Sequence, residues 1–199
     1  MVSGRAGRVA LLLSACILLL TIGCTGDDDG TASAGQSQHS DDLLRQGLDA
    51  HAAGHLDDAE DYYRQAIEAD KDNSYAYYNL GVVLQTREQY VDSERNYRQA
   101  LRVDPNFTSA LFNLAILRVR SDALAEAVAL YDRVTTLDDE FAPAHYNLGL
   151  LLVSLGQTDR AAQELGRAVE LDPALVGKAV AAGASEQVAP PSTEPSGAA

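Results

Sequence analysis

The sequence contains only two cysteines, Cys16 and Cys24, and both lie in its first 24 residues. The rest of the chain can therefore hold no internal disulfide, no cysteine-bound zinc site and no thiol redox centre. Lysine is equally scarce, with two residues against 13 arginines. This preference for arginine is typical of a GC-rich coding genome and indicates a bacterial source.

Basic residues as a whole are few. The chain has 15 Lys and Arg against 29 Asp and Glu, a formal net charge of −14 at pH 7, and two of the basic residues, Arg5 and Arg8, precede every acidic one. Because an acidic body repels phosphate backbones, we expect no nucleic-acid partner. The length of 199 residues and the hydrophobic share of 46% allow one medium domain or a repeat array.

Motifs for catalysis are missing too. The chain has no H-E-x-x-H pair, no phosphate-binding glycine loop and no G-x-S-x-G motif. His51 and His55 are four residues apart, but Gly54 lies between them where a helix should end, so we expect no shared metal ion. We expect His145 to be a core residue. The sequence therefore predicts no enzymatic activity, no metal site and no cofactor.

The N-terminus has the organisation of an export signal. Arg5 and Arg8 precede an uncharged apolar run over residues 9–22, which is shorter than the about 20 residues that a membrane span needs. The run ends in Leu-Thr-Ile-Gly-Cys at residues 20–24, which resembles a bacterial lipobox. The resemblance implies cleavage before Cys24 and lipid attachment to that residue. An uncleaved anchor that leaves the cysteine unmodified is the alternative.

These features divide the first part of the chain into a signal peptide, 1–23, and a lipidated cysteine with a flexible tether, 24–39. The tether is expected because the segment is rich in Gly, Ser, Thr and Asp and lacks apolar periodicity. A lipid anchor would hold the body on the extracytoplasmic face of an inner or an outer membrane. A second match to the lipobox, ending at Cys16, would leave only residues 9–13 as an apolar core, which is too short.

A period of 34 residues runs through the rest of the chain. Four series of residues keep this period: Gly47, Gly81, Ala115 and Gly149; Ala59, Ser93, Ala127 and Ala161; Tyr63, Tyr97, Tyr131 and Leu165; and Ala66, Ala100, Val134 and Ala168. Asp-Pro pairs close the second and fourth units at residues 104–105 and 172–173. The unbroken register predicts four units, 40–73, 74–107, 108–141 and 142–175.

This pattern resembles the tetratricopeptide repeat family, in which small residues stand at positions 8 and 20, a large one at 24 and a small one at 27. The resemblance implies an all-α fold, a right-handed α-solenoid of four helix-turn-helix units. Small residues let the two helices of a unit approach, and large ones fill the space beside them. Residues 176–184 continue the register as a partial capping helix, and residues 185–199, rich in Ser, Pro and Gly, are expected to be a disordered tail.

The resemblance also implies a concave groove lined by positions 2, 5, 6, 9, 12 and 13 of each unit. The predicted peptide-groove residues are Leu44, Arg45, Leu48, Tyr78, Asn79, Val82, Phe112, Asn113, Ile116, Arg120, Tyr146, Asn147 and Leu150. An Asn side chain can pair with the N–H and the C=O of an extended peptide at once, which suits backbone binding. The aliphatic and aromatic members would receive apolar anchors.

Other interpretations of these residues stay open. Part of the apolar stripe can pack between neighbouring units, and the Asn series can satisfy local backbone groups. Arg118 and Arg120 can receive an acidic partner, although cations near a helix C-terminus are favoured anyway. Chaperone-docking members hold a carboxylate with Lys and Asn at positions 5 and 9 of one unit, where this chain has Leu44 and Leu48, so we expect that clamp to be absent.

The sequence thus predicts a non-catalytic adaptor, a membrane-anchored lipoprotein that binds an extended peptide or helix of a protein partner in its groove and so assembles or scaffolds an envelope complex. In architecture it resembles the repeat lipoproteins that help to assemble pili and other envelope machines. Two alternatives remain: a docking platform that regulates a cell-wall enzyme, and a solenoid that self-associates through its ends.

Overall fold

The computed structural model describes residues 29–181, which form nine α-helices, one short 3-10 helix and no strand. The helices are α1 (Asp29–Ala52), α2 (Leu56–Ala69), α3 (Ser74–Thr86), α4 (Tyr90–Val103), α5 (Thr108–Arg120), α6 (Leu124–Leu137), α7 (Ala142–Ser154), α8 (Thr158–Leu171) and α9 (Val176–Ala181), with the 3-10 helix at Pro173–Leu175. The predicted signal peptide, Cys24 and the predicted tail, 185–199, lie outside the described residues.

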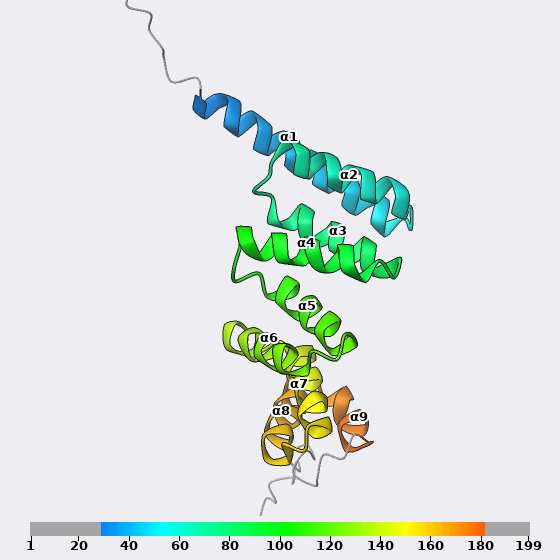
Figure 1. Ribbon diagram of the computed structural model, residues 1–199, viewed down its shortest axis with the longest axis vertical. Coiled ribbons are helices and arrows are strands. Elements are labelled where there is room, and N and C mark those ends of the chain that lie inside the picture. Colours follow the sequence, from blue (N-terminus) through cyan, green and yellow to red (C-terminus); the bar gives the residue numbers. More distant parts are fainter. Residues whose placement is uncertain (1–28, 182–199) are drawn as a thin grey trace, which may run out of the picture.

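The helices pack as consecutive pairs. α1 contacts α2, α3 contacts α4, α5 contacts α6 and α7 contacts α8, and the second helix of each pair then contacts the first helix of the next. Figure 1 shows these pairs stacked along the longest axis, from α1 and α2 at one end to α8 and α9 at the other. The expected α-solenoid of four helix-turn-helix units with a partial capping helix is confirmed.

The prediction of a flexible tether was wrong for residues 29–39, because α1 begins at Asp29. One polar contact with the first unit holds Ser37 of this segment, and a second holds Ser40 directly after it. The Ser37 hydroxyl donates to Oδ2 of Asp70 at 3.1 Å. The buried Ser40 hydroxyl donates to the Ala66 carbonyl at 2.8 Å. These partners lie 26 and 33 residues along the chain, so local composition does not reveal them.

The register of small and large residues sets the distance between the two helices of a unit. A Cβ atom placed on Gly81 would lie 2.7 Å from Cε1 of Tyr97, and one on Gly149 would lie 2.6 Å from Cγ of Leu165. Both distances are too short for non-bonded carbon atoms, so these glycines permit the close approach. In the third unit, a buried Ala115 stands in the same place beside Tyr131.

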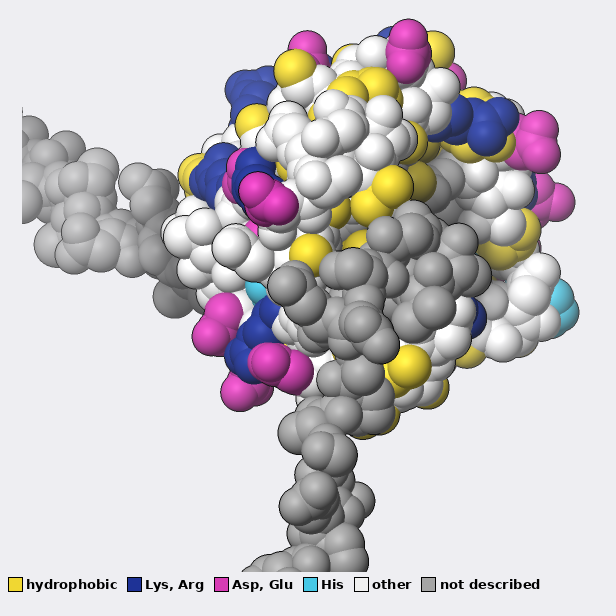
Figure 2. Space-filling view, turned by 90° about the horizontal axis from the view of Figure 1, so that it is seen from below, with side chains coloured by type: hydrophobic (Ala, Val, Ile, Leu, Met, Phe, Trp, Pro, Cys, Tyr) yellow, Lys and Arg dark blue, Asp and Glu magenta, His cyan; other side chains and the backbone are white. Residues whose placement is uncertain are grey.

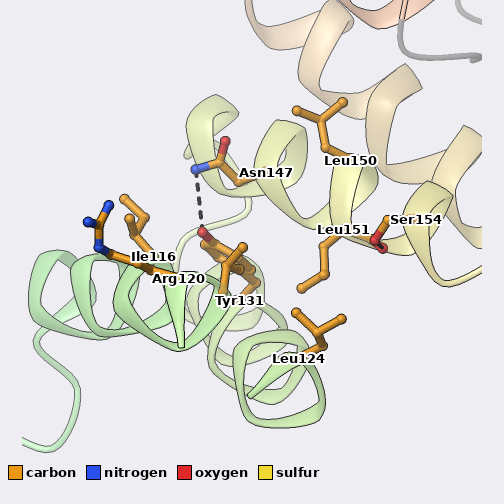
Figure 3. Close-up of a pocket in the computed structure, with 9 residues that line it drawn as sticks. Ile116, Arg120, Leu124, Tyr131, Asn147, Leu150, Leu151 and Ser154 are labelled. Carbon is orange, nitrogen blue, oxygen red and sulfur yellow. Dashed lines mark hydrogen bonds between the residues drawn. The ribbon is translucent and has the colours of Figure 1, made fainter. Parts of the chain in front are cut away.

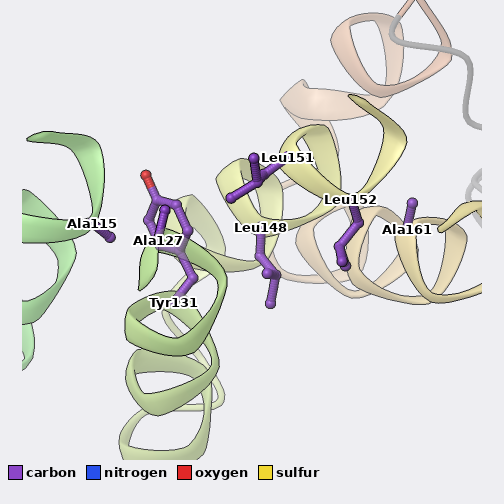
Figure 4. Close-up of a cluster of buried hydrophobic side chains, with 7 residues drawn as sticks. All are labelled: Ala115, Ala127, Tyr131, Leu148, Leu151, Leu152 and Ala161. Carbon is purple, nitrogen blue, oxygen red and sulfur yellow. The ribbon is translucent and has the colours of Figure 1, made fainter. Parts of the chain in front are cut away.

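Clusters of buried side chains join each unit to the next. Figure 4 shows one cluster of buried side chains, formed by Ala115, Ala127, Tyr131, Leu148, Leu151, Leu152 and Ala161. It joins α5 and α6 of the third unit to α7 and α8 of the fourth. Because each unit completes the core of its neighbour, the units stabilise one another.

Within residues 29–181, no helix combines the length and the hydropathy that a bilayer crossing requires. The same residues contain no group of three or more His, Cys, Asp or Glu side chains placed to share a metal ion.

Candidate functional site

A pocket of about 600 Å³ lies between α5 and α7, with α6 contributing to its wall, and we call it the α5–α7 pocket (Figure 3). Its lining residues are Ile116, Val119, Arg120, Leu124, Tyr131, Asn147, Leu150, Leu151 and Ser154. Most of these side chains are aliphatic. Arg120, Asn147, Ser154 and the Tyr131 hydroxyl are its polar groups.

Four of the predicted groove residues line this pocket: Ile116, Arg120, Asn147 and Leu150. Sequence reasoning did not select its other five residues. Val119 and Ser154 occupy positions 12 and 13 of their units, so the repeat pattern had already assigned those positions to the groove. Leu124 and Tyr131 come from the second helix of the third unit, and no signal in the sequence marked that helix as part of the site.

The aromatic residues at position 5 are half-buried. Tyr78 packs against a cluster that includes Leu114 of the next unit, and Phe112 packs against one that includes Leu148 of the next unit. Both rings also contact aromatic rings of their own unit. The Tyr78 ring centroid lies 4.9 Å from that of Phe107. The Phe112 centroid lies 5.8 Å from that of Tyr131 and 5.1 Å from that of Phe141. Leu44 packs against a cluster that includes Leu80 of the next unit, whereas Tyr146 packs against Leu165 and Val169 of its own unit. The alternative interpretation, in which part of the apolar stripe packs between neighbouring units, therefore holds for Leu44, Tyr78 and Phe112.

The remaining predicted apolar and basic residues lie outside the α5–α7 pocket. Leu48 on α1 is 44% exposed. The exposed Arg45, on the same helix, forms an ion pair with Asp42 at 2.7 Å. Val82 packs against the cluster that contains Tyr97. The predicted groove residues of the first two units therefore do not line the α5–α7 pocket, which is formed by residues of the third and fourth units.

The Asn side chains of position 6 already donate hydrogen bonds inside the protein. Nδ2 of Asn79 donates to the Tyr75 carbonyl at 2.8 Å, which is the local backbone contact that the alternative interpretation expected. Nδ2 of Asn113 donates to the Tyr78 hydroxyl at 3.3 Å. Nδ2 of Asn147 donates to the Tyr131 hydroxyl at 3.5 Å, drawn as a dashed line in Figure 3. Each amide retains a second N–H and a carbonyl oxygen for a ligand.

The buried tyrosines of position 24 differ in their hydroxyl partners. The Tyr97 hydroxyl donates to Oε1 of Gln85 at 2.8 Å, and the Tyr131 hydroxyl accepts from Asn147. The Tyr63 hydroxyl is buried and has no partner among the described residues, because the equivalent Asn79 bonds to backbone instead. Burial raises the pKa of Tyr63 and of Tyr131 from 10.0 to about 12.

Replacing Tyr63 by Phe should leave the free energy of unfolding unchanged or raise it. The substitution removes a buried hydroxyl that makes no hydrogen bond, and an unsatisfied buried polar group costs about 1–3 kcal/mol. Urea denaturation followed by circular dichroism measures the change. A loss of more than 1 kcal/mol on the Tyr63→Phe change would show that the hydroxyl has a partner in solution.

Stability should fall at alkaline pH. An unfolded tyrosine ionises near pH 10, whereas the pKa of Tyr63 and Tyr131 is raised to about 12. Between these values the unfolded state releases phenolic protons that the folded state keeps, so the free energy of unfolding decreases as pH rises through this window. Urea midpoints between pH 8 and pH 11.5 test this, with Tyr63→Phe as a variant of shallower slope. A constant midpoint would contradict it.

Two arginines near the end of α5 have different environments. The Arg118 side chain is 13% exposed and forms ion pairs with Glu94 and with Glu126, the latter at 3.7 Å. The exposed Arg120 guanidinium lies over the Tyr90 ring, 3.8 Å from its centroid. Arg118 thus already binds carboxylates of its own chain. Figure 2, seen from the lower end of Figure 1, shows acidic and basic side chains around the rim of that face.

His145 is a buried residue of α7, as expected. Nδ1 lies 2.8 Å from Oε2 of Glu164, and Nε2 lies 3.1 Å from the Asp139 carbonyl oxygen. These contacts join α7 to α8 and to the preceding loop. The residue is part of the packing of the fourth unit and lies outside the α5–α7 pocket.

Comparison with protein-family models gives two matches, each described as a tetratricopeptide repeat. One covers residues 74–107 and the other covers residues 50–73 and 142–175. The helix pair α5 and α6 falls in the third unit, between the matched segments. A search of the curated proteins finds no match.

Several solved structures have the same fold. The MamA protein is 21% identical, with 77% of this chain and 87% of that chain covered and a TM-score of 0.64. PilF of Pseudomonas aeruginosa is 23% identical, with 74% and 69% covered and a TM-score of 0.66. YrrB, described as a TPR protein with an unusual peptide-binding site, is 20% identical, with 81% and 87% covered and a TM-score of 0.64.

Proteins built from such repeats mediate protein–protein interactions, and some of them bind peptides. The fold is typically a non-catalytic scaffold. The family matches, the helix pairing and the structural likeness agree on the repeat type. Residues 50–107 and 142–175 therefore match tetratricopeptide repeats, and the described part of the chain forms a solenoid with the fold of these structures.

Proposed function

We propose that the protein is a membrane-anchored adaptor whose α5–α7 pocket binds an extended peptide or a helix of an envelope partner. The lipidated N-terminal residue is Cys24, and the repeats lie on the extracytoplasmic face of a bacterial membrane. By holding a partner at the membrane surface, the protein assembles or scaffolds an envelope complex.

The observation that carries this proposal is the chemistry of the α5–α7 pocket. Its volume of about 600 Å³ is within the range of about 300–1,000 Å³ that is typical of ligand sites. Aliphatic side chains such as Ile116 and Leu150 can take an apolar anchor, and the Asn147 amide can pair with a peptide backbone. An open apolar hollow of this kind favours a covering partner.

The first part of the chain supports the membrane anchor. The basic and apolar segments before Cys24 have the order of a lipoprotein signal. Because α1 begins at Asp29, its first 11 residues add about 16 Å of helix before the repeats. This helix would direct the repeats away from the bilayer more rigidly than a flexible tether would.

The pocket is tested by in vivo crosslinking and affinity capture with two matched variants. Val119 lines the pocket and is 39% exposed, whereas Leu137, at the end of α6, is 41% exposed and lies outside it. We expect Val119→Arg to lose an envelope partner that the native protein and Leu137→Arg both retain. Equal capture by all three proteins would place the binding surface elsewhere.

The absence of any partner in that experiment would favour self-association, which sedimentation at several protein concentrations would then reveal. A captured cell-wall hydrolase whose activity changes when purified protein is added would favour the docking-platform alternative. Each of these results would replace the adaptor as the function of the repeats.

The anchor is tested separately by metabolic labelling with an alkyne analogue of palmitate and by membrane fractionation. Cys24→Ala should lose the label and leave the membrane fraction, while Cys16→Ala should keep both. Unchanged labelling and membrane association of the Cys24→Ala protein would contradict lipid attachment at that residue.

A further inference from the structure

Most arginines in the described part of the chain are neutralised by carboxylates of the same chain. Arg87 pairs with Asp57 and with Glu60, and Arg118 pairs with Glu94 and Glu126. Within residues 35–178, Arg120 has no such ion pair. Its contact is with the face of the Tyr90 ring. The pocket therefore carries a positive charge that the chain itself leaves unbalanced.

Arg120 is also shared by two pockets. It lines the α5–α7 pocket and a second pocket of about 250 Å³ between α4 and α5, which we call the α4–α5 pocket. Val91, 76% exposed, lines the smaller pocket, and Val119 lines the larger one. A ligand that reaches Arg120 therefore meets apolar surface on both sides of it.

The guanidinium of Arg120 is suited to a carboxylate. The Tyr90 ring covers one side of it and leaves N–H groups to donate, and a carboxylate can accept two parallel hydrogen bonds from them. Glu94, the acidic residue of the α4–α5 pocket, is held by Arg98 at 2.9 Å and by Arg118. The site therefore complements a negative charge supplied from outside.

We propose that Arg120 selects partner segments in which an Asp or Glu side chain lies between large apolar ones, with the carboxylate on Arg120 and the apolar side chains in the two pockets. This inference rests on the proposed function, since it names the chemistry of the peptide that the repeats bind. It adds Arg120 as the residue that determines specificity.

The test uses a random 12-residue peptide library displayed on phage and selected against the purified full chain. Four proteins are compared: the native protein, Arg120→Glu, Arg102→Glu and Val119→Arg. Arg102 is an exposed arginine of α4 that bonds to Gln99 and lines neither pocket, so its reversal controls for the change in net charge. Val119→Arg serves as the variant that blocks the larger pocket.

We expect the native protein and Arg102→Glu to enrich peptides with an acidic residue next to aliphatic or aromatic ones. On Arg120→Glu, the affinity of a selected acidic peptide should fall at least tenfold, and changing its acidic residue to Lys should restore binding. Such a charge swap indicates that the two side chains lie close together, because Arg102→Glu controls for net charge and a general loss of folding would not be rescued by the peptide.

Two results would overturn the inference. The first is that the enriched peptides show no preference for an acidic residue, or show a preference that Arg120→Glu does not change. Arg120 would then not determine specificity. If Val119→Arg nevertheless abolished the binding of these peptides, the proposal that the α5–α7 pocket binds peptides would remain supported. Failure of the native protein to enrich any peptide would overturn both the selection by Arg120 and the proposed peptide-binding function.

Discussion

Replacing Tyr97 by Ala should lower the free energy of unfolding by about 3–5 kcal/mol, as expected for a large side chain removed from a packed core. Tyr97 is 0% exposed and packs with Leu114 and Leu117 of α5, so it joins the second unit to the third. The cavity would therefore weaken an interface between units as well as the pairing of α3 with α4. Urea denaturation of the purified protein, followed by circular dichroism, measures the loss.

The matched control is Tyr97→Phe, which keeps the ring and removes the hydrogen bond to Gln85. Its cost should be only about 0.5–1.5 kcal/mol, because a single net hydrogen bond contributes about that much. If Tyr97→Ala cost no more than Tyr97→Phe, ring packing would not be the source of stability at this position.

Replacing Gly149 by Val should destabilise the protein by about 3 kcal/mol, at the upper end of the range for overpacking. A Cβ atom on Gly149 would meet Cγ of Leu165 at 2.6 Å and the backbone nitrogen of the same residue at 3.2 Å. Leu165 is itself buried on the facing helix and cannot move away freely. α7 and α8 would have to separate to admit the new side chain.

Gly166 on α8 supplies the control for this prediction. No atom lies within 4 Å of a Cβ placed there, so Gly166→Val should change stability by less than about 0.5 kcal/mol, and in the stabilising direction, because valine has the better helix propensity. Thermal or urea unfolding of both variants gives the comparison. Equal destabilisation by the two substitutions would contradict the close-approach role of Gly149.

The candidate site was only partly predictable from the sequence. Ile116, Arg120, Asn147 and Leu150 follow from the repeat register, because helical periodicity places them on one face. The register did not reveal that the second helix contributes Tyr131, nor that the Asn147 amide already bonds to the Tyr131 hydroxyl. Such contacts depend on the distance between helices from adjacent units.

Arg118 and Arg120 illustrate the same limit. Both lie in the last turn of α5 and look alike in the sequence. Residues two apart on a helix point to nearly opposite sides, so Arg118 reaches Glu94 and Glu126 while Arg120 reaches the ring of Tyr90 and the pocket. Which arginine meets a carboxylate is decided by the neighbouring helices.

The sequence by itself determined the repeat length, the pairing of the helices and the close approach at Gly81 and Gly149, because these depend on the order of small and large residues at a fixed spacing. Only the tertiary structure decided that α1 extends back to Asp29 and that one open pocket lies between α5 and α7. The physical reason is that hydrogen bonds, ring contacts and ion pairs within and between units join residues far apart in the chain, and composition and periodicity do not record such pairings.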